Sequence, residues 1–516
     1  MNLGVVAILN RLLRSKSIIL GSTLCVAMLP HTLLADVGTF WRAKELDQYV
    51  VESDKDAWIE IVQSPCEDNL SYSISDIMGR EADSGNVASA NCTSKVKLNL
   101  PSGYYHLNIK GVVKGIYSLE PKKLPDYFGV DAALNYIVKD ENLRHQYIQL
   151  LKRIDINVAR ERLIWLDLSP NNGVWDGNYK TDSLRKQYQN SNVQILEAVQ
   201  VPMFGNLGFP SSDKIMTDFP KVTQRWKKTW IGIEPKNEPN NVQGQRLSVK
   251  DMVAYVDRYL SYSREMHNAI GNDVLVVNGT FAGSLYANTE FSKTISSRKD
   301  FFESKGDFSF HTYETAEELI QTLTQYKSWL KSKGFSGNVW ITESGVKSYS
   351  DDLTTVNQQN MDVAVQIAAK AIVGYSAGVK HYFPFVLPFY TEKDPRGRIR
   401  YFGLTSKDGS PNLSLAAYVQ AGKILAGSPQ SDVKFLAFDH GFKALIPAEE
   451  NVVIAVYHNS NEKKTFPTGA MYAEGIDGRR IEKGQGDFLP DEKLMYFFFS
   501  KEESTAANHF FAESML

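Results

Sequence analysis

The sequence contains only three cysteines in 516 residues and has almost no excess of charge, with 57 basic and 59 acidic side chains. So little cysteine excludes a small scaffold held together by disulfides. The formal charge of −2 excludes a strongly basic nucleic-acid scaffold, because no surplus of Lys and Arg is available to neutralise phosphates. Beyond residue 35, no apolar run is long enough to span a bilayer. What remains is a globular composition, 43% hydrophobic, with a length typical of two to four domains.

Residues 1–35 differ in pattern from the rest of the chain. They carry three basic residues and no acidic one, followed by an apolar stretch from Ser17 to Leu29 and by Ala35. This pattern predicts a secretory signal peptide, and therefore a secreted or periplasmic protein with no transmembrane anchor after cleavage. An uncleaved membrane anchor is the alternative, which we favour less because polar residues and Pro30 interrupt the apolar run.

The cysteines fit the same compartment. Cys25 lies in the predicted signal, so Cys66 and Cys92 remain as an even pair. In an oxidising compartment we expect one disulfide closing a loop of about 26 residues, worth on the order of 3 kcal/mol in the chain-entropy model. Two free thiols are the alternative. A metal site is not expected there, because no other His or Cys lies nearby at ligand spacing.

Two segments of short alternating strands flank a central region. Runs such as 57–62 and 104–109, separated by turn residues, predict an antiparallel β-sandwich over residues 36–119. A second β module with a tail is predicted over residues 428–516, from the run 452–457 and the turn Asp477-Gly478. The remaining residues, 120–427, form the predicted catalytic domain.

In this central region, eight short apolar runs alternate with helical stretches. From Gly129 to His381 they cover 252 residues, or about 36 residues for each interval, which suits one strand, one helix and two loops. This count predicts an α/β fold of the (β/α)8 TIM-barrel type rather than an open doubly wound sheet. No glycine-rich dinucleotide or phosphate-binding loop is present, which disfavours nucleotide binding. The predicted strands lie near residues 128–130, 157–163, 199–204, 230–233, 274–277, 308–310, 339–342 and 382–385.

Two glutamates follow strands of this predicted barrel. Glu238 lies just beyond the fourth strand and Glu343 ends the seventh, 105 residues later, or about three βα units. The carboxyl ends of the fourth and seventh strands face each other across a barrel mouth, which is where TIM-barrel enzymes place reacting groups. Two carboxylates on either side of one cavity are what glycosidic bond cleavage requires.

The segments around these glutamates resemble known motifs. Asn237–Pro239 and Ile341–Gly345 resemble the acid/base and nucleophile motifs of the large TIM-barrel clan of retaining glycoside hydrolases. Within that clan, the flanking β modules and the start at 128–130 resemble family 39 and PslG-like exopolysaccharide hydrolases, with the barrel similarity covering about residues 127–427. The resemblance implies an exported retaining hydrolase of a polysaccharide or oligosaccharide, acting by double displacement without a metal or organic cofactor.

The resemblance also implies roles for single residues. Glu343 matches the nucleophile and Glu238 the general acid/base, whose pKa should be raised before the first step. Asn237 matches the residue that holds the 2-hydroxyl of the sugar being cleaved. Arg160 resembles an arginine near the nucleophile, where a fixed cation would keep that glutamate ionised. Tyr313 resembles the tyrosine that hydrogen-bonds the nucleophile.

Three further residues remain as alternatives or additions. His311 lies two residues before that tyrosine and shares its face of the strand, so it is either a site residue or a buried structural histidine. Arg162 competes with Arg160 because both point to the same side of a strand. Glu234 competes with Glu238 for the acid role, although it would sit inside the strand.

Aromatic residues in the βα loops are candidate platforms for sugar rings. We expect Trp165, Trp175 and Phe209 to be substrate-binding. Further candidates are Phe204, Tyr286, Phe389 and Tyr390, and for any single one of these rings ordinary core packing is the preferred interpretation. The eighth strand, 382–385, has no tryptophan where many clan members place one beneath the reacting sugar. The basic run 393–400 could bind an acidic polysaccharide, but a solvated loop is the preferred interpretation.

The alternative function belongs to a different class. The protein would then be a carbohydrate-binding or exopolysaccharide-biosynthesis accessory protein that keeps the barrel but has little or no catalytic turnover. The intact motifs disfavour this alternative. Association with an exopolysaccharide or cell-envelope system is compatible with either function, and the charge predicts no nucleic-acid partner.

Overall fold

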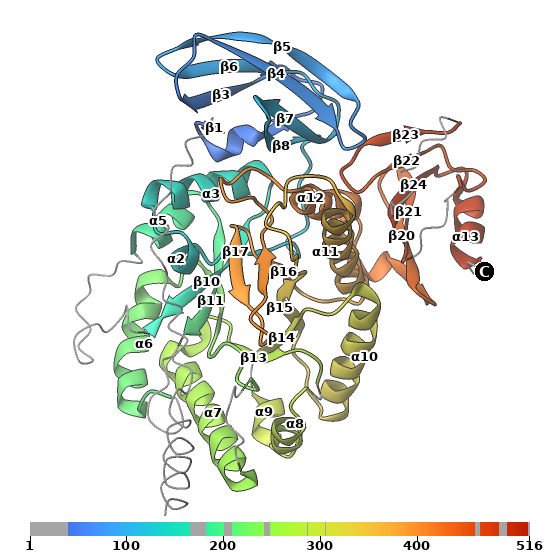
Figure 1. The fold of residues 1–516 in the computed structure, drawn as a ribbon. Helices are drawn as coiled ribbons and strands as arrows, with labels where there is room; N and C mark the ends of the chain where they lie inside the picture. Colours follow the sequence, from blue (N-terminus) through green and yellow to red (C-terminus); the bar gives the residue numbers. More distant parts are fainter. Residues whose placement is uncertain are drawn as a thin grey trace, which may run out of the picture.

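The computed structural model describes residues 40–165, 182–200, 209–241, 248–285, 287–304, 306–459, 465–484 and 493–513. The predicted signal peptide lies outside these residues, as does Trp175. Figure 1 shows a central barrel of strands surrounded by helices, with an N-terminal sheet against one side and a C-terminal sheet against another. None of the described helices has the length and apolar character needed to cross a membrane.

The central sheet has eight parallel strands in the order β12-β11-β10-β9-β16-β15-β14-β13. Its two outer strands meet through a parallel bridge between Ile233 and Val276, and the Ile233 amide donates to the Leu275 carbonyl at 2.8 Å. The sheet therefore closes, and the prediction of a (β/α)8 barrel is confirmed. Its strands are β9 Val130–Asp131, β10 Val158–Ile164, β11 Gln194–Gln200, β12 Trp230–Glu234, β13 Val277–Ala282, β14 Asp307–Thr312, β15 Val339–Gly345 and β16 Tyr382–Phe385.

Two strands lie several residues from their predicted positions. The third was expected at 199–204, but β11 spans Gln194–Gln200. Its buried Glu197 breaks the apolar pattern, and the structure tolerates this carboxylate because Arg185 forms an ion pair with it at 2.8 Å. The expectation failed because a charge paired from a neighbouring helix can occupy a strand interior.

The fifth strand was expected at 274–277, but β13 spans Val277–Ala282. Asn278 is buried there beside Ser263, and Gly279 adopts a φ of +92°. A Cβ at Gly279 would lie 2.5 Å from a ring carbon of Phe308, so this position needs glycine. Polar and glycine residues thus replace the apolar run that marks most buried strands.

Helices cover the outside of the barrel. The longest of those described is α7 Val249–Ile270, whose N-terminus is capped by Ser248 accepting from the Asp251 amide. Thr315 and Glu318 form a capping box at the start of α10. The others are α2 Leu134–Ile137, α3 Glu141–Arg153, α5 Asp182–Asn190, α6 Ser212–Trp226, α8 Thr289–Ser296, α9 Lys299–Glu303, α10 Ala316–Ser332, α11 Gln358–Ser376 and α12 Leu413–Leu425.

The N-terminal part is an eight-stranded sheet in the order β1-β3-β6-β5-β4-β7-β8-β2, antiparallel except where β2 pairs with β8. A disulfide joins Cys66 and Cys92, whose Cα atoms lie 4.6 Å apart, so the predicted pairing is confirmed. The strands are β1 Phe40–Ala43, β2 Val50–Glu52, β3 Ala57–Ser64, β4 Asn69–Asp76, β5 Glu81–Ala90, β6 Thr93–Leu98, β7 Gly103–Ile109 and β8 Val112–Leu119.

The C-terminal part is a six-stranded sheet in the order β19-β20-β21-β24-β22-β23 with helix α13 Ser504–Ala512 against it. Tyr457 anchors this sheet to the barrel helices through Gln366 at 2.7 Å, and Asp477 accepts from the Tyr104 amide of the N-terminal sheet at 3.0 Å. The strands are β19 Lys434–Phe438, β20 Gly441–Pro447, β21 Asn451–His458, β22 Tyr472–Glu474, β23 Arg480–Glu482 and β24 Leu494–Ser500.

Candidate active site

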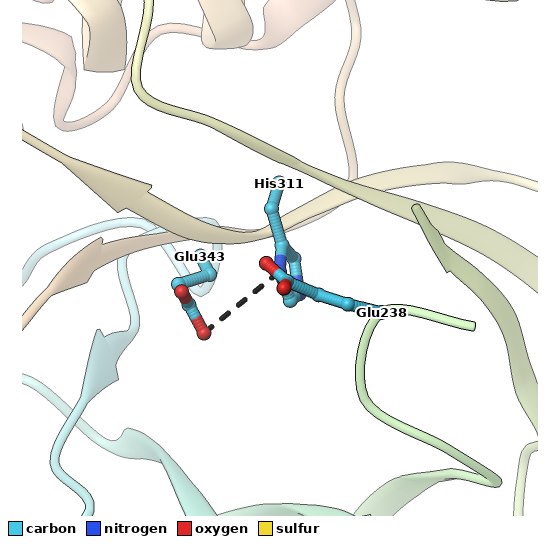
Figure 2. A group of neighbouring side chains, drawn as sticks. All are labelled: Glu238, His311 and Glu343. Carbon is cyan, nitrogen blue, oxygen red and sulfur yellow. Dashed lines mark hydrogen bonds and ion pairs between the residues drawn. The ribbon is translucent and has the colours of Figure 1, made fainter. Parts of the chain in front are cut away.

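Three titratable side chains converge at the carboxyl ends of the barrel strands. Glu238 follows β12, His311 is in β14 and Glu343 is in β15. Figure 2 shows both carboxylates directed toward the histidine ring. One oxygen of each carboxylate and a ring nitrogen all lie within 4.8 Å of one another. The structure thus brings together both predicted glutamates, from strands that the sequence separates by 105 residues.

Glu238 has an uncommon backbone conformation. Its φ of +47° is left-handed, which costs a non-glycine residue on the order of 1–3 kcal/mol. Two contacts with Asn241 support this turn, because the Asn241 amide donates to the Glu238 carbonyl at 3.0 Å and Asn241 Nδ2 donates to Oε2 at 2.9 Å. The other carboxylate oxygen, Oε1, lies 2.9 Å from Nδ1 of His311.

The surroundings of His311 fix which ring nitrogen carries the hydrogen. Nε2 lies 3.4 Å from Nη2 of Arg160, and a guanidinium can only donate. Nε2 is therefore the acceptor, so Nδ1 carries the hydrogen and donates it to Glu238. Burial is the largest single influence and would raise the pKa of Glu238, but His311, the Asn241 hydrogen bond and the Arg160 charge together outweigh it and lower that pKa to about 2. The expectation of a raised pKa is wrong for the free protein, because it ignored these neighbours.

Glu343 is surrounded by donors and is only 6% exposed. Its Oε2 accepts from Nη1 of Arg160 at 2.8 Å and from Nη2 of Arg162 at 3.3 Å. Its Oε1 accepts from the Tyr313 hydroxyl at 2.5 Å. Burial acts to raise the pKa of Glu343, but the adjacent His311 ring and the Arg160 charge outweigh it and lower the pKa. Glu343 is therefore held as the carboxylate. Arg160 and Arg162 were alternatives for the arginine beside this glutamate, and both of them contact it.

Tyr313 remains a donor under all ordinary conditions. Burial raises the pKa of its hydroxyl well above the usual value, and the neighbouring Glu343 charge raises it further. The hydroxyl therefore keeps its proton and points it at the carboxylate. The ring also contacts Gly345, where a Cβ would lie 2.2 Å from Cε1 of the tyrosine.

Two buried carboxylates behind the mouth hold the arginines in place. Asp131 at the end of β9 accepts from Arg160 at 2.7 Å and from Arg162 at 2.8 Å. Glu234 accepts from Nε of Arg160 at 2.7 Å. Asp131, Glu234 and Arg160 have side chains with 0% exposure. Glu234 thus faces the arginine from inside the barrel, away from the mouth, and the sequence interpretation did not identify Asp131.

Asn237 presents a free donor to the mouth. Its Oδ1 accepts from Nη2 of Arg160 at 2.7 Å, which fixes the orientation of the amide. Its Nδ2 has no hydrogen-bond partner among the residues that the structure describes. Arg160 therefore touches Asp131, Glu234, Glu343 and Asn237 at once, and it is the central residue of this network.

Two of the predicted aromatic platforms are wrong. Trp165 is 1% exposed and stacks on Phe219 with ring centres 5.2 Å apart. Phe209 is 7% exposed and packs against Tyr262 at 5.2 Å. Both rings fill the space between barrel and helices, so they offer no face to a sugar. Trp175 lies outside the described residues.

Other aromatic rings stand at the mouth instead. Tyr313, with 44% of its surface exposed, has Phe385 and Phe402 at ring-centre distances of 6.1 and 6.0 Å. Tyr390 lies 5.6 Å from Phe385, and Tyr136 lies 6.5 Å from Tyr390. Phe385 ends β16, Tyr390 and Phe402 belong to a hairpin of β17 Tyr390–Lys393 and β18 Ile399–Phe402, Tyr313 follows β14, and Tyr136 is in α2. The eighth strand lacks tryptophan, but its last residue, Phe385, is aromatic and lies beside Tyr313.

The donor set of Glu238, His311 and Glu343 would also suit a divalent metal by residue type. However, two guanidinium groups already contact Oε2 of Glu343 at 2.8 and 3.3 Å. A cation bound there would meet both positive charges within a few ångströms, so the electrostatics favour proton chemistry by these side chains.

Comparison with known proteins decides the class of chemistry. The family model described as glycosyl hydrolase catalytic core matches residues 171–418, a range that holds both glutamates. The protein is a glycoside hydrolase. No curated protein sequence matches the chain.

A solved structure of another glycoside hydrolase shares its fold. The family 39 enzyme from the gut symbiont Bacteroides cellulosilyticus WH2 matches with a TM-score of 0.66 at 13% identity, over 89% of this chain and 100% of that one. This match shows a shared TIM barrel with added β domains. A GH5_18 enzyme from Streptomyces cattleya matches at 12% identity with a TM-score of 0.44, over 58% of this chain and 80% of that one.

Proposed function

We propose that the protein is an exported retaining glycoside hydrolase that cleaves a polysaccharide or oligosaccharide by double displacement, with Glu343 as nucleophile and Glu238 as acid/base. The observation that carries the proposal is the approach of the two carboxylates, which have oxygens within 4.8 Å of each other. Retaining enzymes separate these groups by about 5–5.5 Å, whereas inverting enzymes need about 6.5–9.5 Å to admit a water molecule.

In the first step, Glu343 attacks the anomeric carbon while Glu238 gives its proton to the leaving oxygen. The glycosidic bond breaks and an ester to Glu343 forms, so that carboxylate loses its negative charge. Arg160 and Tyr313 prepare the step by holding both oxygens of Glu343 as acceptors, which keeps it ionised and oriented. The free Nδ2 of Asn237 is the donor available for the 2-hydroxyl.

Glu238 must gain a proton before it can act as the acid. In the free protein its pKa is lowered to about 2, so substrate binding has to supply the change. A sugar bound across the mouth excludes water, which disfavours the ionised carboxylate and raises its pKa. In the second step Glu238 takes a proton from the incoming water, and the His311 N–H stabilises the carboxylate in the base form.

Product stereochemistry tests the mechanism. NMR of the first product formed should show the anomeric configuration of the substrate, and Glu343→Gln should lower hydrolysis of every substrate by several orders of magnitude. Inversion of configuration would contradict the proposal. If the wild-type protein hydrolyses no member of a polysaccharide panel, the accessory carbohydrate-binding function replaces it.

Substitution of Glu238 should cause a different defect in activity from substitution of Glu343. Glu238→Ala should lose most activity on substrates with a poor leaving group and still form the ester from an aryl glycoside. Added azide should then release a glycosyl azide of retained configuration. Equal loss on both substrates without azide rescue would remove Glu238 from the acid/base role.

Export is supported by the Cys66–Cys92 disulfide, because such bonds persist in oxidising compartments. Mass spectrometry of the protein from the periplasm or medium should find a mature N-terminus near Asp36. A full-length chain retained in the cytoplasm would refute export.

A further inference from the structure

A cavity of about 440 Å³ lies far from the two glutamates. It is formed by the linker after β8, the end of α3 with the loop leading to β10, and one face of α12. Because α3 leads into the start of β10, this cavity lies at the amino ends of the barrel strands, whereas Glu238 and Glu343 lie at the carboxyl ends. Figure 1 shows α3 and α12 beside the N-terminal sheet. Its lining residues are Leu119, Glu120, Pro121, Lys122, Lys123, Lys152, Arg153, Ile154, Asp155, Val419 and Lys423.

The lining holds more cations than anions. It holds four lysines and one arginine against Glu120 and Asp155. Oδ2 of Asp155 already accepts from the Leu124 amide at 2.6 Å. None of the four lysine ammonium groups has a hydrogen bond or an ion pair with any residue that the structure describes. A positive potential therefore fills the cavity.

Lys423 is the unusual member, because only 7% of its surface is exposed. Burial lowers the pKa of its ammonium group, although Glu474 and Glu120 counteract part of that effect. Glu474 is not within ion-pair distance, and its Oε2 accepts from Gln420 at 2.6 Å. An unpartnered ammonium is costly to bury, and a methionine would fill the same space without that cost. An anion entering the cavity would supply the missing partner.

The uncharged part of the lining is Leu119, Pro121, Ile154 and Val419. Only Pro121 among them is exposed, because the other three are at most 6% exposed. Apolar surface at the cavity therefore comes from Pro121 and from the methylene stems of the lysines. A sugar ring would pack its C–H faces against these groups and carry its charge on a carboxylate, whereas a bare inorganic anion would leave them unused.

We propose that this cavity binds an acidic saccharide, with a carboxylate at Lys423 and further charges at the surrounding lysines. The site would hold an anionic glycan on the face opposite the hydrolytic centre. The inference uses the activity on glycans and is independent of how Glu238 and Glu343 divide the reaction.

Calorimetric titration of the full-length protein tests this proposal. The probes are a trimer of galacturonic acid, a neutral trisaccharide and inorganic phosphate. We expect the acidic trimer to bind, with an affinity that falls as salt rises, and the neutral one to bind at least ten-fold more weakly. Phosphate binding as tightly as the acidic trimer would overturn the saccharide assignment.

Variants locate the binding. Lys423→Met keeps the side-chain volume and should weaken binding of the acidic trimer at least ten-fold. Lys152→Ala changes an exposed residue at the rim, cannot disturb the core, and should weaken binding three- to ten-fold. The matched control Lys333→Ala, an exposed lysine after α10 that lines no part of the cavity, should leave it unchanged. Equal affinity in Lys152→Ala and wild type would refute the site.

Two further outcomes separate this proposal from others. Hydrolysis of an aryl glycoside should be unchanged in Lys152→Ala, and binding of the acidic trimer should persist in Glu343→Gln. Loss of that binding in Glu343→Gln would place the trimer in the hydrolytic centre and overturn the second site. Capture on phosphatidylglycerol vesicles that depends on Lys152, without binding of the acidic trimer, would make the ligand a lipid surface instead.

Discussion

Tyr313→Phe removes one hydroxyl next to Glu343 and leaves the ring between Phe385 and Phe402. The lost contact is a 2.5 Å hydrogen bond to Oε1 of Glu343. A hydrogen bond to a charged group contributes about 1.5–3 kcal/mol. Because this bond stabilises only the ionised carboxylate, its loss raises the pKa of Glu343 by about one to two units, at 1.36 kcal/mol per unit.

The sign of the effect on activity follows from the proposed role of Glu343. A nucleophile acts as the carboxylate, so the rate should fall on the acid side as Glu343 takes up a proton. In the wild type, the pH at which the rate falls on the acid side should lie below the usual pKa of a glutamate. The reason is that His311 and Arg160 outweigh burial and lower the pKa of Glu343. In Tyr313→Phe this acid limb of the pH profile should move about one to two units toward higher pH.

The assay is kcat/KM against pH with an aryl glycoside, whose leaving group needs no proton from Glu238. Tyr326→Phe is the matched control, because it removes a buried hydroxyl that donates to the Gly283 carbonyl at 2.9 Å, away from both glutamates. The control should keep the wild-type acid limb. If Tyr313→Phe keeps it as well, the hydrogen bond does not tune Glu343 and the reasoning fails.

Three other substitutions test the surrounding structure. Gly345→Ala should shift the acid limb in the same direction as Tyr313→Phe, because the new Cβ would lie 2.2 Å from Cε1 of Tyr313 and push the ring away; an unchanged limb would contradict this. Replacing Cys66 and Cys92 by serine should lower the unfolding free energy of the N-terminal sheet by about 3.5 kcal/mol for a 26-residue separation, measured by urea denaturation, and an equal midpoint would refute the contribution. Asp131→Asn removes one charge from a buried network and should lower stability by about 3–5 kcal/mol in thermal unfolding, whereas a wild-type Tm would show that Asp131 does not hold the arginines.

The barrel and its main site residues could be predicted because their signals are local. Strand ends follow from short apolar runs, and residues two apart on a strand share a face, so Arg160 and Arg162 were expected on one side. Both contact Glu343 in the structure. The same rule placed His311 beside Tyr313, and both side chains reach the pair of glutamates.

The aromatic surroundings could not be predicted in the same way. Trp165 and Phe209 follow strands as a sugar platform would, but helices cover them in the folded chain. Tyr390 was a candidate from the sequence because it follows the eighth strand, and it reaches the mouth through the hairpin after β16. Tyr136, which meets Tyr390 from a segment more than 250 residues earlier, was not a candidate. No spacing in the sequence records such contacts, because they depend on the direction in which a loop leaves the barrel.

The protonation state of a site residue is harder still to predict from the sequence, as Glu238 shows. A motif identifies the carboxyl group that reacts, and the chemistry of a poor leaving group requires that group to be protonated. In the free protein, burial of Glu238 is outweighed by His311, Asn241 and Arg160 together, and the pKa falls to about 2. Arg160 also contributes indirectly, since its donation to Nε2 leaves the ring hydrogen on Nδ1, facing the carboxylate. If Glu238 is the acid, as we propose, its protonated form arises in the complex with substrate, and proton uptake then accompanies binding.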